Sequence, residues 1–238
     1  MRTDSLLLRY LEEKDFVDMF MAGEIRMNSL GFFRGNHDEP SKIGQIDRYE
    51  GLTCPVGARS TDDCRVTDRY QYCNLLCCHR LNYYEDGETL GWYLDETMNH
   101  FGDYVVIIKN RDEFQRRLVR AASEAGFKCG CNVVDYSSRV SADRDVFDKE
   151  KMYAYQNEWR AALYRETDEC EPCILSIGPI NDIAEWCRTR DLQQHLYKIF
   201  HNRDFIGSQD QYYGNIDRKQ FAQLFHEWDS TSLKGGRL

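Results

Sequence analysis

Proline and long apolar runs are scarce in this sequence. Only 4 of its 238 residues are prolines, and no apolar run approaches the roughly 18–20 residues that a membrane-spanning helix requires. The first apolar stretch, Leu6 to Leu8, ends at Arg9 and is too short for the apolar region of a signal peptide. We therefore expect a soluble, cytoplasmic protein that does not bind a membrane.

Basic residues are in the minority. The chain has 31 lysines and arginines against 40 aspartates and glutamates, which gives a formal net charge of −9. Nonspecific binding to nucleic acid depends on neutralising phosphates with basic side chains, so this balance argues against a general nucleic-acid coat protein. It does not exclude a local basic cleft, because arginines cluster between Arg111 and Arg120.

Several short signatures of nucleotide and hydrolytic enzymes are absent. The sequence has no G-x-G-x-x-G, no G-x-x-x-x-G-K and no H-E-x-x-H, which argues against a Rossmann site, a P-loop and a zinc protease. It also lacks the G-x-S-x-G turn of the serine hydrolases. No internal repeat, coiled coil or low-complexity tract is present.

Cysteines, in contrast, are numerous, with ten in the chain. Without a secretion signal, reduced thiols are favoured over disulfides. The alternative is a zinc site that combines Cys170 and Cys173 with Cys129 and Cys131. The first pair has the spacing of a zinc knuckle, but a C-x-C pair is not its usual second half. We therefore expect free thiols and no bound metal.

The hydrophobic pattern predicts an α+β fold. Strands are expected at 6–10, 25–29, 71–78, 89–94, 104–108, 131–136, 159–164 and 174–177, and helices at 12–22, 112–125, 192–201 and 218–228. A further helix is expected from Asn181 or Asp182 toward Arg188. Regular alternation of strands and helices is missing, so curved antiparallel β-sheets flanked by helices are favoured over a parallel sheet. We expect one domain spanning 1–238, with a helical C-terminal part at about 180–238.

One segment, from Lys151 to Arg160, combines polar and aromatic side chains at the start of an expected strand. Gln156 and Glu158 are two residues apart, so in an extended stretch both would point to the same side and into one cleft. A carboxylate there could stabilise positive charge or bind a ribose hydroxyl. The alternative is that Glu158 merely pairs with Arg160 on an exposed face of the sheet.

The string from Gln156 to Glu158, followed by an apolar strand, resembles the Q-x-E signature of ADP-ribosyltransferases, above all the DarT-like enzymes that modify nucleic acids. The opening strand, the helix after it and Gly23 are similar to the first unit of these enzymes, whose first strand ends in an Arg or His that contacts NAD. DarT-like enzymes usually carry a His there, whereas this chain has Arg9 and Tyr10. The resemblance implies an ADP-ribosyltransferase-like fold and NAD as the substrate.

The resemblance also implies roles for single residues. Such enzymes split nicotinamide from NAD through an oxocarbenium-like state, which Glu158 would stabilise through the nicotinamide ribose. Arg34 would lie near the phosphates, and the segment 35–70 would close over the bound dinucleotide. A tyrosine would stack on nicotinamide or adenine. The expected site therefore has Glu158, Gln156 and Arg34 as catalytic residues, and Arg9, Tyr10, Arg34 and Tyr153 as NAD-binding residues.

Three functions stay open. The first is an NAD-dependent ADP-ribosyltransferase that modifies RNA, DNA or a protein, as a toxin or anti-phage defence effector with an antitoxin or inhibitor protein as its partner. In this case Glu158 is expected to govern the NAD chemistry and Gln156 the acceptor. The second is an NAD glycohydrolase on the same fold, with water as the acceptor. The third is a non-catalytic module that binds a nucleotide or a partner.

Overall fold

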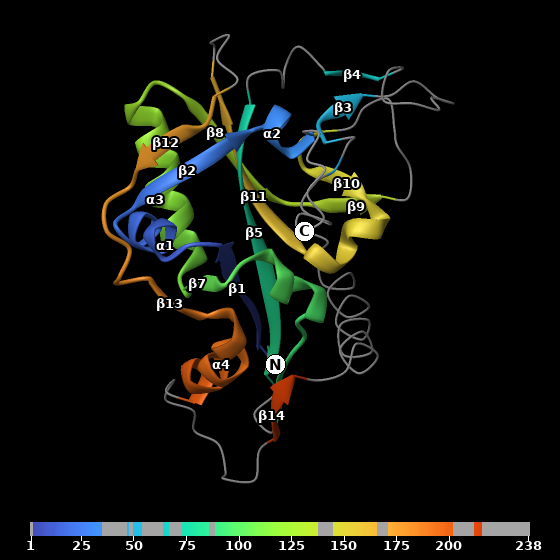
Figure 1. Ribbon diagram of the computed structural model, residues 1–238, viewed down its shortest axis with the longest axis vertical. Coiled ribbons are helices and arrows are strands. Elements are labelled where there is room, and N and C mark those ends of the chain that lie inside the picture. The colour runs from blue at the N-terminus through green and yellow to red at the C-terminus, as the bar shows by residue number, and fades with distance from the viewer. Residues whose placement is uncertain are drawn as a thin grey trace, which may run out of the picture.

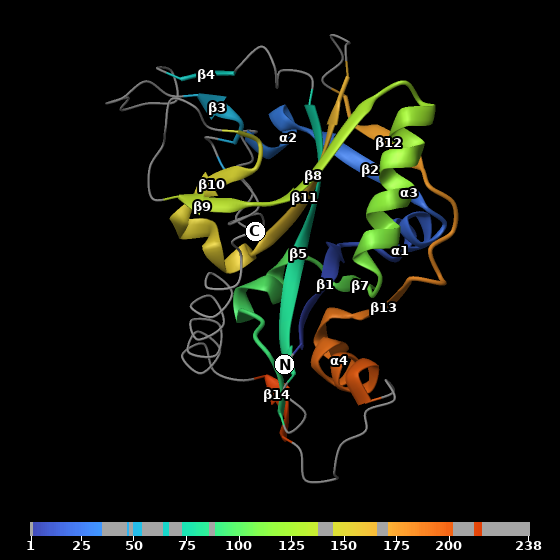
Figure 2. The same cartoon turned by 180° about the vertical axis from the view of Figure 1, so that it is seen from behind.

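A long strand, β5 (Cys73–Glu85), runs through the middle of the molecule (Figures 1 and 2). The computed structural model describes residues 2–34, 47, 50–53, 64–66, 73–85, 89–137, 145–165, 171–201 and 212–215. Its other strands are β1 (Arg2–Leu11), β2 (Glu24–Ser29), β3 (Leu52–Thr53), β4 (Arg65–Val66), β6 (Thr89–Trp92), β7 (Tyr104–Ile108), β8 (Lys128–Val133), β9 (Asp135–Ser137), β10 (Asp148–Glu150), β11 (Glu158–Tyr164), β12 (Cys173–Ser176), β13 (Ala184–Arg188) and β14 (Tyr212–Asn215). The helices are α1 (Lys14–Met21), α2 (Leu30–Arg34), α3 (Arg111–Glu124) and α4 (Leu192–His201), with short 3₁₀ helices η3 (Glu96–Phe101), η4 (Lys151–Gln156) and η5 (Thr189–Asp191).

The described strands assemble into one ten-stranded sheet around β5, with two further two-stranded sheets beside it. β1 and β11 both pair antiparallel with β5, on opposite edges, and β7 and β13 continue the sheet beyond β1. In the ten-stranded sheet, the pair of β6 and β14 is the parallel one among the described strands. The expected α+β class with a large antiparallel sheet and few helices is therefore confirmed.

The central strands are buried on both faces, which explains their unbroken apolar runs. In β1, Leu7 packs in the cluster beneath α1 and α3, whereas Leu6 and Leu8 pack in a second cluster with α4. The strand β7 divides its side chains between the same two clusters. Figures 1 and 2 show α1 and α3 together on one side of β5, and β9, β10 and η4 on the other.

Local sequence signals locate α1, α3 and α4 well, whereas the short helices α2, η3 and η4 were not expected. Asn110 caps the first turn of α3, because its Oδ1 accepts a hydrogen bond from the Glu113 amide at 3.1 Å. On the surface of this helix, Arg116 and Arg117 pair with Glu113, and Arg117 also pairs with Asp182. The arginine cluster is thus neutralised by local carboxylates in these pairs and does not form a basic cleft there.

The helix expected from Asn181 or Asp182 toward Arg188 is wrong, because this segment forms the strand β13. Ala184 and Cys187 are buried, and the strand pairs antiparallel with β7. Pairing with a free edge of the sheet has outweighed a weak local helix signal. The C-terminal part is therefore mixed, since its described residues form β13, η5, α4 and β14.

Two other expectations concern poorly covered segments. The helix at 218–228 lies outside the described residues, and so does most of the segment 35–70. Within the latter, Asp47 and Glu50 are described, and both are buried. Among the described helices, none is long and apolar enough to cross a membrane.

Candidate functional site

The sheet splits where β1 and β5 part, and a cavity of about 420 Å³ lies at this split. The two strands pair as far as Leu8 and His79, after which β1 continues along β7. The same edge of β5 is next occupied by β2, at Leu75. Between these points the edge is not paired with any described strand. Elements from both sides of the split supply the lining: β1, α1, β2, α2, β5, η3, β10, η4, β11 and β12.

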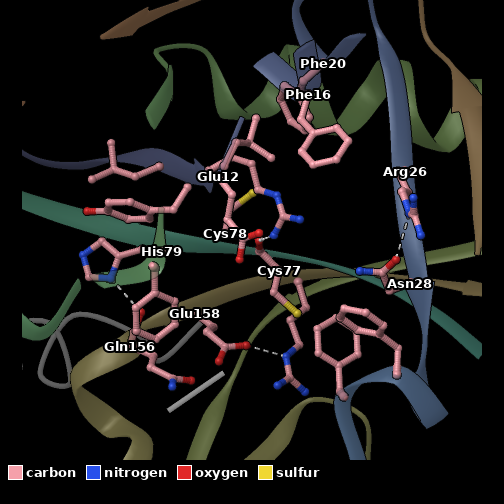
Figure 3. Close-up of a pocket in the computed structure, with 18 of the residues that line it drawn as sticks. Glu12, Phe16, Phe20, Arg26, Asn28, Cys77, Cys78, His79, Gln156 and Glu158 are labelled. Atoms are coloured by element: carbon pink, nitrogen blue, oxygen red, sulfur yellow. Dashed lines mark hydrogen bonds and ion pairs between the residues drawn. The ribbon is translucent and has the colours of Figure 1, made fainter. Parts of the chain in front are cut away.

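The side chain of Glu158 lies at the inner wall of this cavity, in a buried cluster of charges (Figure 3). Its Oε1 accepts a hydrogen bond from Lys149 Nζ at 2.7 Å, and its Oε2 accepts one from Arg160 Nε at 2.7 Å. The other end of the Arg160 guanidinium binds both carboxylate oxygens of Glu50, at 2.6 and 3.0 Å. Two cations and two anions thus balance one another in this cluster.

These partners keep Glu158 ionised. Burial alone raises the pKa of its carboxyl, but Arg160 and Lys149 outweigh burial and lower that pKa to about 2. The two carboxylates raise the pKa of Lys149 and of Arg160 in return, against the effect of burial. Glu158, Lys149 and Arg160 therefore stay charged at neutral pH. A carboxyl in this state cannot act as a general acid, but it can stabilise a cation or accept hydroxyl groups.

Gln156 does not lie in an extended strand, as was expected, but its side chain does enter the same cavity as that of Glu158. Gln156 ends the helix η4, and Asn157 then adopts a left-handed conformation with φ of 38° before β11 begins. The two side chains converge because Lys149 holds both of them, donating to Gln156 Oε1 at 2.7 Å as well as to Glu158. Strand alternation is not the cause. The carbonyl of the Gln156 side chain is thereby turned toward Lys149.

His79 is the cross-strand partner of Glu158 and also lines the cavity (Figure 3). Its Nδ1 lies 2.7 Å from the backbone oxygen of Gln156. Burial lowers the pKa of His79 to about 4, so the imidazole is neutral at physiological pH. Nearby, Tyr10 is buried in the wall formed by β1, and burial raises the pKa of its phenol.

The structure brings together four of the six residues predicted for the site. Glu158, Gln156, Arg9 and Tyr10 all line the cavity. Arg9 Nη1 donates to the backbone oxygen of Cys77 at 2.9 Å and so bridges the split in the sheet.

The remaining two predicted residues, Arg34 and Tyr153, are not among the residues that line this cavity. Arg34 ends the helix α2, whose neighbouring Phe32 and Phe33 do line it. The ring of Tyr153 packs against the ammonium of Lys149, with 4.9 Å between Nζ and the ring centroid. Tyr153 therefore contacts the charge cluster through Lys149.

The outer part of the cavity is apolar and aromatic. Phe16 and Met19 of α1, Phe32 of α2 and Ile174 of β12 line it and are each at least two-fifths exposed. Figure 3 shows Phe16 and Phe20 across the cavity from Glu158 and Gln156, with Arg26 at a third side. The cavity therefore combines a charged inner wall with an apolar mouth.

Sequence reasoning did not foresee that the pair of Glu158 and Arg160 is buried. The ion pair itself is confirmed. The expectation that it lies on an exposed face of the sheet is wrong, because Arg160 is only 1 % exposed. The signal was present in β11, where Arg160 stands among Trp159, Ala161, Ala162 and Leu163. A strand that is apolar on both faces is a buried strand, and a buried charge must be paired. Lys149 and Glu50 had no such signal.

The cysteines give no support to a thiol nucleophile in this cavity. Burial raises the pKa of the Cys77 thiol to about 12, so it is not a thiolate at neutral pH. Seven described cysteines are free, as expected, but Cys64 is disulfide-bonded, which corrects the expectation of free thiols at this position. Cys170, half of the alternative zinc pair, lies outside the described residues. Within the described part of the chain, no cluster of three or more His, Cys, Asp and Glu side chains could hold a metal ion.

The cavity thus joins an ionised carboxylate, an amide held by the same lysine, a neutral imidazole and an aromatic mouth. Such a set can bind a planar, polar ligand and stabilise positive charge that develops on it. Comparison of the chain with protein-family models, with curated proteins and with solved structures finds no match.

Proposed function

We propose that this protein is an NAD-dependent ADP-ribosyltransferase that modifies a nucleic acid or a protein. The proposal rests above all on one observation, the ionised carboxylate of Glu158 at the inner wall of an aromatic-lined cavity. The resemblance of the string from Gln156 to Glu158 to the Q-x-E signature adds to it.

The chemistry requires an anion at that place. In NAD, cleavage of the bond between the nicotinamide nitrogen and ribose C1 sends the electron pair to the ring nitrogen, and positive charge develops on the ribose. The acceptor then bonds to C1 and loses a proton to water. A fixed carboxylate beside the ribose stabilises this charge without reorganisation during the reaction. Its oxygens offer about four acceptor positions, of which Lys149 and Arg160 occupy two, so ribose hydroxyls can still bind.

The two cations of the cluster offset the charge of its two carboxylates, but Glu158 can still stabilise the positive charge on the ribose. Coulomb energy falls with distance, so the group in direct contact with the ribose counts most. Lys149 and Arg160, which also line the cavity, hold the Glu158 carboxylate in place through their ion pairs with it. Their role in the proposal is to keep Glu158 deprotonated and oriented.

The volume of the cavity and the residues that line it also suit a dinucleotide. Its volume of about 420 Å³ falls in the range typical of ligand sites, and aromatic side chains at its mouth can stack on planar rings. Arg9 and Arg26, both in the lining, supply positive charge for phosphates.

Incubation with NAD labelled in its adenosine part tests the proposal. We expect free nicotinamide together with label on RNA, DNA or protein. Glu158→Gln should abolish both, whereas Glu113→Gln, a carboxylate variant on the outer surface of α3, should not. Circular dichroism would verify that both variants fold.

Other outcomes favour the alternatives. Free nicotinamide and ADP-ribose without labelled acceptor would indicate an NAD glycohydrolase. Binding of NAD without turnover would indicate a non-catalytic module. Full turnover by folded Glu158→Gln would refute the assignment of the site.

A further inference from the structure

Two cysteines stand side by side on the strand β8, outside the cavity. Cys129 and Cys131 are both partly exposed, and both pack against the core cluster beneath α1 and α3. They pair across the sheet with Leu163 and Ala161 of β11, so both thiols lie on one face of β8. Glu158 is an odd number of residues from both partners on β11 and faces the other side of the sheet. The cysteine pair is therefore separate from the proposed NAD site.

The two thiols are in contact with each other. The Cys131 thiol donates a hydrogen bond to the Cys129 sulfur, which lowers the pKa of Cys129 and raises the pKa of Cys131. In the other free cysteines that the structure describes, burial raises the pKa of the thiol: Cys73, Cys77, Cys78, Cys173 and Cys187. Among these thiols Cys129 thus ionises most readily, and the thiolate is the reactive form of cysteine.

We propose that Cys129 and Cys131 form a reactive dithiol, which a hydroperoxide oxidises to a disulfide. The proposal depends on two partly exposed thiols in contact on one strand, and it does not rest on the proposed function. A hydroperoxide is a small, uncharged oxidant, so partial exposure of the sulfur is sufficient for its attack.

The backbone of β8 can accommodate this bond. Residues two apart in a strand have Cα atoms about 6.6 Å apart, at the upper end of the range of roughly 4.4–6.8 Å that disulfides span. The residue between the two cysteines is Gly130, whose lack of a side chain lets the backbone shorten this distance. Among the described strands β8 pairs with β11 alone, so none of them restrains its other edge. Closure of the disulfide therefore needs only a local adjustment.

The oxidation proceeds in two steps. The Cys129 thiolate attacks the terminal oxygen of the hydroperoxide, so an S–O bond forms, the O–O bond breaks, and the departing oxygen takes a proton from water. The product is a sulfenic acid on Cys129. The Cys131 sulfur then attacks the Cys129 sulfur, the S–S bond forms as the S–O bond breaks, and the hydroxyl group leaves with the Cys131 proton as water. The two sulfurs lose two electrons in total, which reduce the hydroperoxide to an alcohol and water.

Mass spectrometry of the full, folded chain provides the test. The protein is treated with hydrogen peroxide, its remaining thiols are alkylated after unfolding, and it is digested with trypsin. The tryptic peptide 129–139 holds Cys129 and Cys131 and no other cysteine, whereas the tryptic peptide 70–80 holds three buried or half-buried thiols. Peptide 129–139 should lose two hydrogens and carry no alkyl group, at a rate at least about tenfold higher than the loss of thiols from peptide 70–80. Dithiothreitol should reverse the change.

Serine variants separate the roles of the two thiols. In Cys131→Ser the sulfenic acid on Cys129 has no partner, so it should persist and react with dimedone, a reagent for sulfenic acids. Cys129→Ser removes the more acidic thiol, so its remaining Cys131 should react with peroxide about tenfold more slowly than Cys129 does in Cys131→Ser. Cys173→Ser is the matched control, because it removes another thiol that belongs to the same core cluster. It should oxidise as the wild type does.

A second reagent tests the contact between the thiols without oxidation. Phenylarsine oxide bridges two neighbouring thiols, because two As–S bonds form and one water is released. The wild type and Cys173→Ser should each bind one equivalent, which protects peptide 129–139 from alkylation. Cys129→Ser and Cys131→Ser should leave that peptide unprotected.

The opposite results overturn the proposal. Peptide 129–139 may not remain fully alkylated after peroxide treatment, nor oxidise as slowly as peptide 70–80, if the dithiol exists. A disulfide from this peptide to a different cysteine, or no protection of the folded wild type by the arsenical, would contradict the contact between Cys129 and Cys131. None of these results bears on NAD turnover, so the proposed function stands or falls separately.

Discussion

Lys149 Nζ lies 2.7 Å from Glu158 Oε1, inside a cluster that is almost closed to solvent. The same ammonium donates to Gln156 Oε1 and lies 3.8 Å from Glu50 Oε2. One buried cation thus holds the carboxylate proposed for the NAD chemistry and the amide proposed for the acceptor. The consequences of this arrangement can be measured without knowing the acceptor.

Replacement of Lys149 by methionine should destabilise the fold strongly. Lys149→Met leaves two buried carboxylates for the single guanidinium of Arg160, and breaking a buried ion pair from one side costs about 3–5 kcal/mol. The measurement is equilibrium unfolding in urea. Lys149→Arg, which keeps the charge, should lower the free energy of unfolding by less. Lys151→Met, at an exposed position of η4, should leave that free energy almost unchanged. Equal stability of Lys149→Met and Lys151→Met would contradict the prediction.

Glu158 should contribute stability that disappears in acid. Its pKa in the folded protein is lowered to about 2 from an ordinary value of 4.5, so the folded state favours the ionised form. This stabilisation is complete above pH 4.5 and is lost as pH falls from 4.5 toward 2, with a size on the order of 3 kcal/mol. The unfolding free energies of wild type and Glu158→Gln should therefore converge over this range. If the difference between the two unfolding free energies stayed constant over this range, the pKa of Glu158 in the folded protein would not be lowered.

His79 should give a separate pH dependence at higher pH. Its folded pKa of about 4 lies below the ordinary value of 6.5, so the folded state favours the neutral ring. The contribution is present above pH 6.5 and is lost as pH falls from 6.5 toward 4, because protonation then favours the unfolded chain. His79→Gln should remove this part of the stability profile. His100→Gln, at an exposed position, is the control and should leave the profile as it is.

Local patterns in the sequence were sufficient for much of the fold. The helix at 192–201 was predicted with the bounds that α4 has, because its apolar periodicity and its packing agree. The strand at 184–188 was missed, since its structure depends on the free edge of β7, which no local pattern reveals. Pairing across the sheet is a tertiary property and overrides weak propensity.

The candidate site was predictable only in part, for a related reason. Gln156 and Glu158 were found because they are close in sequence. Glu50 and Lys149, which complete the charge cluster, come from separate segments and meet Glu158 only through the fold. Isolated charged residues carry no signal of burial, whereas Arg160 is marked by its apolar neighbours.

The role of Gln156 gives the last prediction. Because Lys149 also pairs with Glu158, loss of the Gln156 side chain should leave the carboxylate ionised and NAD cleavage largely intact. The amide of Gln156 accepts from Lys149 through its oxygen and donates to the Tyr155 hydroxyl at 3.3 Å through its nitrogen. Its nitrogen is therefore the donor side of the amide, the side that suits an acceptor group carrying a lone pair. Gln156→Ala should therefore depress transfer to the acceptor far more than hydrolysis of NAD, as measured by labelled product and free nicotinamide in one reaction. Gln115→Ala, on the surface of α3, should alter neither rate. A parallel fall of both activities in Gln156→Ala would place Gln156 in NAD binding or in the support of Lys149, and the division of roles between Gln156 and Glu158 would not hold.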